Sequence, residues 1–164
     1  MTPPSATGVF LHPVQVRFGD CDPAGIAYFP RFFEWFHEAM EAWFDDALGR
    51  PYHEVLRRHG FPAVHTECDY AAPCRFGDRI TVELRLGALG QSSLRLDYTV
   101  RGAEGGVRAS AHTRVVMIGT DPTLPDHLRS VPIPDDLRAR LEAFRSGTPG
   151  AAGPPSTAAH PGAD

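Results

Sequence analysis

The chain has 164 residues, of which 42% are hydrophobic, so it is long and apolar enough to form one domain with its own core. Its formal charge of −4 at pH 7, without any block of like charge, argues against the basic face that nucleic-acid-binding proteins need. No apolar run approaches the ~20 residues of a membrane span, and the segment MTPPSATGVFLHP lacks the features of a signal peptide, so we expect a cytoplasmic protein with neither nucleic-acid nor membrane partners.

The first part of the chain predicts a strand, a turn and a long helix. Residues 1–12 are expected to form a flexible arm, ahead of a domain over 13–145. Residues 14–18 alternate apolar and polar side chains, which is the period of a strand. After the turn GDCDPAG, residues 31–49 repeat apolar side chains at three- and four-residue steps. Further aromatic residues widen this stripe, so we expect a helix that is buried on most sides.

A shorter helix and several strands should follow. A second helix is expected over 52–60, where Gly60 would end it. The period then changes to two, which predicts strands over 81–86, 94–100 and 107–119 with glycine-containing turns between them. Consecutive strands linked by hairpins form an antiparallel sheet, so the sequence predicts an α+β domain with the long helix on one face of the sheet.

Three segments are patterned more weakly. Residues 63–73 are expected to add a fourth strand, and residues 134–144 a helix. Residues 146–164 are rich in Pro, Gly, Ala and Ser, which favours a disordered tail.

Cysteine and histidine spacing gives no sign of a disulfide framework or a metal centre. Cys21, Cys68 and Cys74 form no C-x-x-C pair, which is typical of reduced thiols. The eight histidines show no H-E-x-x-H or similar spacing. We therefore expect neither a metal site nor a cofactor.

The turn before the long helix carries the candidate chemistry. Pro23 biases Asp22 toward extended backbone conformations, and Gly25 allows a positive φ or a close backbone approach. The first N–H groups of a helix lack internal partners and lie at the positive end of its dipole, so they can hold a carbonyl oxygen and its developing oxyanion. A carboxylate just upstream could attack that carbonyl or activate a water, which is acyl-transfer chemistry.

Simpler interpretations compete with this one. Aspartate is common in turns because its side chain accepts bonds from nearby backbone N–H groups, and Asp20 is expected to do only that. A D-x-D pair also occurs in phosphatase and glycosyltransferase loops, but no threonine or metal partner follows here. Cys21 lacks the activating histidine that a thiol nucleophile needs.

The stretch FGDCDPAGIAYFPRFFEWF closely resembles the signature of the 4-hydroxybenzoyl-CoA thioesterase family, a branch of the hotdog-fold thioesterases. The later pattern RFGDRITVELRL fits the family's sheet more loosely, so residues 12–133 are compatible with it. The resemblance implies a hotdog fold, in which an antiparallel sheet wraps a long helix. It also implies a homo-oligomer, a dimer or tetramer, with active sites at the subunit interface and acyl-CoA as substrate.

The resemblance also implies roles for individual residues. Asp22 falls on the family's catalytic carboxylate, which is nucleophile or general base in cleaving the thioester. Phe29 falls where a backbone N–H at the helix start binds the thioester carbonyl. Gly25 matches the turn between them, and Tyr28 beside it is a further candidate for substrate binding.

Departures from the family concern the substrate. His37 stands where the 4-hydroxybenzoyl-specific enzyme has a helix carboxylate for the phenol, so another acyl group is possible. GQSS replaces the family's basic loop for the CoA phosphates, and Ser93 is kept as a candidate lining the CoA channel. The phosphates then need other cations, for which the candidates are Arg75, Arg95, Arg101 and Arg108. His65 and Asp69 share one side of a predicted strand and could support a water, although spacing alone is weak evidence for catalysis.

Three functions follow from the sequence. The first is an acyl-CoA thioesterase acting on an aromatic or short acyl group. The second is a hotdog hydratase or dehydratase, whose histidine base usually comes from a different motif. The third is a non-catalytic acyl-CoA-binding module, which would not need the carboxylate of Asp22.

Overall fold

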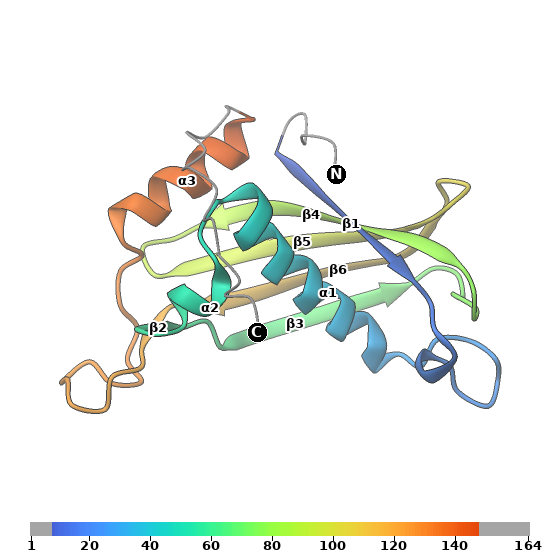
Figure 1. Ribbon diagram of the computed structural model, residues 1–164, viewed down its shortest axis with the longest axis horizontal. Coiled ribbons are helices and arrows are strands. Elements are labelled where there is room, and N and C mark those ends of the chain that lie inside the picture. Colours follow the sequence, from blue (N-terminus) through green and yellow to red (C-terminus); the bar gives the residue numbers. More distant parts are fainter. Residues whose placement is uncertain (1–7, 148–164) are drawn as a thin grey trace, which may run out of the picture.

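The fold is a five-stranded antiparallel sheet with a long helix across one face (Figure 1). A computed structural model describes residues 8–147. The strands, in the order in which they pair, are β1 (Val9–Gln15), β4 (Arg79–Leu89), β5 (Ser93–Gly102), β6 (Val107–Val116) and β3 (Ala63–Tyr70). A second, two-stranded sheet joins β2 (His59–Gly60) to β7 (Ile118–Gly119). This is the α+β architecture that the sequence predicts.

The helices account for the rest of the regular structure. The long helix α1 (Pro30–Ala42) continues through one π-helical turn, η2 (Trp43–Ala47). A 3₁₀ turn, η1 (Phe18–Asp20), precedes it, and α2 (Tyr52–Val55) and α3 (Asp135–Ser146) follow. None of the helices in residues 8–147 is long and apolar enough to cross a membrane.

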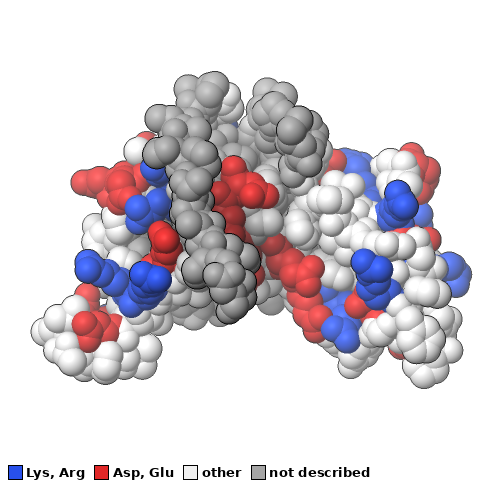
Figure 2. Space-filling view, viewed as in Figure 1, with Lys and Arg blue, Asp and Glu red and all other residues white. Residues whose placement is uncertain are grey.

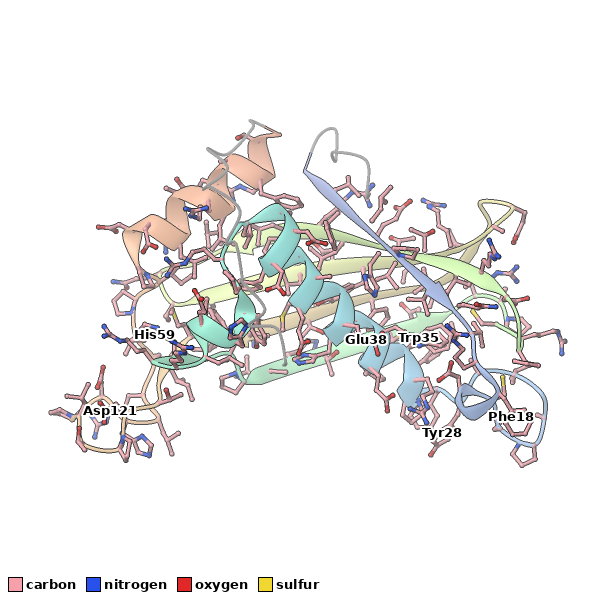
Figure 3. The ribbon with its side chains drawn as sticks, in the orientation of Figure 1. Phe18, Tyr28, Trp35, Glu38, His59 and Asp121 are labelled. Atoms are coloured by element: carbon pink, nitrogen blue, oxygen red, sulfur yellow. The ribbon has the colours of Figure 1, made fainter. Side chains whose placement is uncertain are left out.

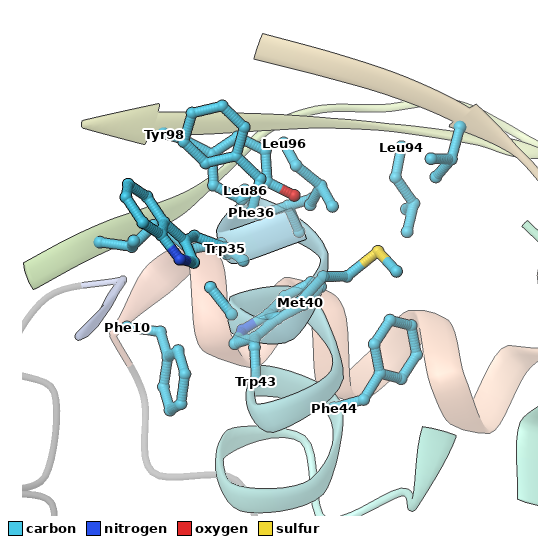
Figure 4. Packing of buried hydrophobic residues seen from close by; sticks show 14 of the residues in the cluster. Phe10, Trp35, Phe36, Met40, Trp43, Phe44, Leu86, Leu94, Leu96 and Tyr98 are labelled. Carbon is cyan, nitrogen blue, oxygen red and sulfur yellow. The ribbon is translucent and has the colours of Figure 1, made fainter. Parts of the chain in front are cut away.

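The core lies between the long helix and the sheet (Figure 4). Alternate residues of β4 and β5 point inward, as their period of two predicts. They meet the buried side of α1, where the Phe36 ring stacks on Tyr98 with 4.7 Å between ring centroids. The helix side chains that fill this space are Phe32, Trp35, Phe36, Ala39, Met40, Trp43 and Phe44.

The side of the long helix that faces away from the core is exposed and acidic. Glu34, Glu38 and Glu41 project from it, and acidic side chains gather over α1 in the space-filling view (Figure 2). The prediction of a helix buried on most sides is confirmed for its aromatic residues except Phe33, which is partly buried, while this charged stripe stays at the surface.

Several boundaries differ from those expected. Strand β1 begins at Val9 and pairs with β4, so residues 9–12 belong to the sheet and not to an arm. Helix α2 ends at Val55, because His59 and Gly60 pair with β7 instead of continuing the helix. The helix expected near the end of the chain is present as α3. The predicted disordered tail lies outside the described residues, apart from residues 146 and 147.

Candidate active site

The turn before α1 is a tight hairpin that closes on itself. Cys21 pairs with Ala27 in an antiparallel bridge. Inside it, the Gly25 N–H donates to the Asp22 carbonyl at 2.9 Å, and the Asp22 N–H donates to the Ile26 carbonyl at 3.0 Å. Gly25 has φ +75°, in the left-handed region that glycine adopts most readily. This backbone fixes Asp22 close to the start of the helix.

The two aspartates of this turn have different partners. The Asp20 carboxylate accepts the Arg17 N–H at 2.6 Å and lies 3.7 Å from the Arg31 guanidinium, so it braces the turn as expected. Asp22 is half-buried. Among the described residues, its carboxylate accepts one hydrogen bond, from the Ala24 N–H to Oδ1 at 2.8 Å. Within residues 8–147, its Oδ2 has no hydrogen-bond or ion-pair partner. Asp22 therefore keeps one carboxylate oxygen for a ligand or a water.

The N–H of Phe29, at the helix start, makes no hydrogen bond within residues 8–147. The neighbouring Tyr28 N–H donates to the Asp20 carbonyl at 2.8 Å, and the Arg31 N–H to the Tyr28 carbonyl at 2.9 Å. Pro30 has no N–H. Among the described residues, no acceptor lies within hydrogen-bonding distance of the Phe29 N–H. A donor of this kind, at the positive end of a helix dipole, suits an oxyanion.

Phe29 also lines a largely apolar cavity of about 490 Å³. Its walls come from the turn, the start of α1, the end of β3 and the loop after β3. The Tyr70 hydroxyl donates to the Phe29 carbonyl at 3.4 Å, and the Tyr70 ring packs edge-on against Phe32 at 5.1 Å. The cavity is within the size range of small-molecule sites. It is lined by Ile26, Ala27, Phe29, Phe32, Tyr70, Ala71, Ala72, Pro73, Cys74 and Arg75.

Tyr70 is a site residue that sequence reasoning missed. Its only signal was its place at the end of a predicted strand, which says nothing about contact with the helix start. Desolvation and a hydrogen bond with Cys68 raise the pKa of Tyr70 to about 12, so its hydroxyl stays protonated at neutral pH. Tyr70 can therefore donate a hydrogen bond but does not serve as a base.

Several exposed aromatic side chains lie in or next to the hairpin and the loop after β3. Phe18 is 81% exposed and Phe29 57% exposed. Phe18 lies edge-on to Phe76 with 6.1 Å between centroids, and Tyr28 lies edge-on to Phe29 at 5.2 Å. Phe18 and Tyr28 project from the same end of the molecule (Figure 3). An apolar patch of this kind marks a binding surface.

Two predicted site residues lie elsewhere. His37 projects from the exposed face of α1, where its Nε2 lies 3.1 Å from the Glu41 carboxylate. Ser93 begins β5, at the end of the sheet opposite the hairpin (Figure 1). Asp22, Gly25, Tyr28 and Phe29 share the hairpin and the helix start, and of these four Phe29 lines the cavity, whereas His37 and Ser93 lie elsewhere.

Of the four arginines considered for the CoA phosphates, Arg75 is the one that lines the cavity. No carboxylate within the described part of the chain pairs with its guanidinium. The other three are each held by a carboxylate at 2.7–2.8 Å: Arg95 by Asp97, Arg101 by Glu83 and Arg108 by Glu104.

The cysteines near the site are not activated. Burial raises the pKa of the Cys74 thiol to about 11, so it is protonated at neutral pH. The Cys21 thiol lies 3.8 Å from the Arg17 carbonyl, to which it donates. Neither thiol has a hydrogen bond or ion pair with a histidine in residues 8–147.

Comparisons with known proteins show the family and the fold of the chain. A model of the thioesterase-like superfamily matches residues 16–141. The chain is 42% identical over 86 residues to a 1,4-dihydroxy-2-naphthoyl-CoA hydrolase of Synechococcus elongatus; this alignment covers 51% of the chain and 62% of the curated relative's length.

Two solved structures share the fold over nearly their whole length. One is a 1,4-dihydroxy-2-naphthoyl-CoA thioesterase from Synechocystis, at 29% identity and a TM-score of 0.73, with 82% of this chain and 96% of that one covered. The other is a gentisyl-coenzyme A thioesterase, at 28% identity and a TM-score of 0.71, with coverages of 80% and 99%.

Proposed function

The chain belongs to the thioesterase-like superfamily, and from this we propose that it hydrolyses an aromatic acyl-CoA to the free acid and CoA. The observation that carries the proposal is the junction of hairpin and helix. There, the Asp22 carboxylate, with one oxygen unpaired among the described residues, lies within eight residues of the Phe29 N–H, which has no hydrogen-bond partner in residues 8–147, and Phe29 lines an apolar cavity.

The reaction would divide between two groups. The Asp22 carboxylate either attacks the thioester carbon or takes a proton from a water that does so. The carbonyl oxygen becomes an oxyanion, which the Phe29 N–H stabilises. The tetrahedral intermediate then collapses and expels the CoA thiolate. If Asp22 is the nucleophile, water hydrolyses the resulting anhydride in a second step.

An aromatic acyl group fits the cavity best. The rings of Phe29, Phe32 and Tyr70 line it, and stacked or edge-on contacts between rings favour an aryl group over an alkyl chain. The names of the relatives point the same way, since dihydroxynaphthoyl and gentisyl are both hydroxylated aryl groups. The protonated Tyr70 hydroxyl would donate to such a group in exchange for its 3.4 Å hydrogen bond to the Phe29 carbonyl.

Arg75 is proposed to bind a phosphate of CoA. Replacing it with glutamine should raise KM for the preferred aryl-CoA about tenfold with little change in kcat, because the contact is the same in the ground and transition states. The measurement is thiol release from benzoyl-, 4-hydroxybenzoyl- and 1,4-dihydroxy-2-naphthoyl-CoA, and from the matching acyl-pantetheine thioesters.

The acyl-pantetheine thioesters separate the proposed hydrolysis from the proposed role of Arg75 in phosphate binding. They lack the nucleotide phosphates, so Arg75→Gln should not change their KM. The matched control is Arg114→Gln, an exposed arginine on β6, which should leave every parameter unchanged. No hydrolysis of any thioester by the wild-type chain would contradict the proposed function. Equal KM increases for acyl-CoA and acyl-pantetheine would contradict the role of Arg75 alone.

We also propose that a second copy of the chain closes the cavity. Strand β3 is a sheet edge that pairs with β6 alone among the described strands, and seven of its eight residues are exposed. The end of β3 lies at the same end of the molecule as the exposed Phe18 and Tyr28 (Figures 1 and 3). Sedimentation of the protein at assay concentrations should show a dimer or larger. A fully active monomer would contradict the proposal.

A further inference from the structure

Two imidazoles and a carboxylate meet on the face of the sheet away from α1. His65 and Glu67 are two apart on β3, so they share a face. The register places His112 of β6 directly opposite Glu67. Tyr70 lies on the other face, where it contacts Phe32 of α1. The group is therefore separate from the candidate active site.

The three side chains converge at distances suited to one ion. The Glu67 carboxylate lies 3.0 Å from His112 Nδ1 and 3.4 Å from His65 Nε2. The imidazole rings are stacked with 5.1 Å between centroids, and one ligand atom from each residue lies within 4.8 Å of the other two. Bonds of about 2.0–2.2 Å to a tetrahedral ion put neighbouring ligand atoms roughly 3.4 Å apart. The Glu67–imidazole separations of 3.0 and 3.4 Å are close to this value.

We propose that His65, Glu67 and His112 bind a divalent transition metal, with zinc as the best fit. Neutral imidazoles favour zinc, copper and nickel over magnesium and calcium, which prefer all-oxygen sites. Three protein ligands leave the fourth position to water. The ion would displace the Glu67–imidazole contacts and replace them with three metal–ligand bonds.

Charged residues near the three ligands affect the affinity of the site for a cation. Arg114, opposite His65 in the register, opposes cation binding, and it is exposed and therefore screened. Asp97, opposite His112 on β5, contributes negative charge. Its carboxylate accepts the Arg95 Nε–H at 2.8 Å, so it acts at longer range and not as a ligand.

The site would cross-link the edge of the sheet. His112 follows Glu67 by 45 residues, so the ion would join two strands that are distant in sequence. It would hold β3 against β6 at the middle of β3, three residues before Tyr70. Linear spacing gave no signal of this group, because the third ligand comes from another strand.

Zinc binding to the full, tag-free chain tests the proposal. After chelator treatment and buffer exchange, titration calorimetry with zinc chloride should show one ion per chain. His65→Ala and His112→Ala should each weaken binding about 100-fold or more, since even loss of an outer-shell partner costs 10–100-fold. His53→Ala, which removes an exposed histidine from α2, is the matched control and should bind like the wild type.

Cobalt distinguishes this site from the cysteines. The Co²⁺ protein should show visible ligand-field bands without the strong near-ultraviolet band of a thiolate ligand. Zinc binding that persists in both histidine variants, a cobalt–thiolate band, or no zinc binding by the wild type would each overturn the proposal. Equal melting temperatures of the metal-free variants and wild type show that the substitutions remove ligands and not the fold.

Discussion

Replacing Asp22 with asparagine should lower kcat for the preferred aryl-CoA about 10³-fold, within the range that a positioned general base or nucleophile contributes. The substitution keeps the shape of the side chain, and the amide oxygen can still accept the Ala24 N–H. It removes the charge that attacks the carbonyl or takes a proton from water. Acyl-CoA affinity should stay within a few-fold of wild type, because the cavity and Arg75 are unchanged.

The assay pairs thiol release with equilibrium binding of the same acyl-CoA. Asp46→Asn is the matched control, since Asp46 is an exposed carboxylate in the turn after α1 and should keep full activity when neutralised. Full activity of Asp22→Asn would remove this carboxylate from the mechanism. Tight binding without thiol release by the wild-type chain would favour the non-catalytic binding module instead.

Local sequence was enough to predict the parts of the site that lie close together in the chain. Asp22, Gly25 and Phe29 belong to one turn and one helix start, whose geometry depends on nearby backbone preferences. The positive φ of Gly25 follows directly from these, as does a Phe29 N–H that has no partner among the described residues. Likewise, the aromatic spacing of α1 predicted its buried side, because helix periodicity alone determines which residues share a face.

Contacts between distant segments could not be predicted in the same way. Tyr70 reaches Phe29 only because β3 lies beside the start of α1, and no pattern in β3 shows this. Arg75 was one of four equal candidates from the sequence, and the structure places it in the cavity wall, with no carboxylate of residues 8–147 paired to its guanidinium. Residues 9–12 joined the sheet because β4 is long enough to pair with them, a non-local cause that their own sequence does not carry.

Phe29→Pro should lower kcat about 100-fold, the low end of the loss seen when one oxyanion donor is removed. Proline deletes the N–H and fixes φ near −65°, which is close to the φ of −52° at Phe29. The deleted N–H donates to no other described residue, so no internal hydrogen bond is lost. Phe29→Ala removes the same ring but keeps the N–H, and it should retain kcat within a few-fold.

The pair of variants therefore separates the role of the Phe29 N–H from that of its aromatic ring. A role of the aromatic ring in binding would raise KM equally in both, whereas oxyanion stabilisation lowers kcat only in the proline variant. Circular dichroism and melting temperature should match between the two, which would rule out a broken helix start as the cause. Equal kcat values would place the oxyanion donor elsewhere, and the Tyr70 hydroxyl, which is protonated and lines the same cavity, would then be the next group to remove.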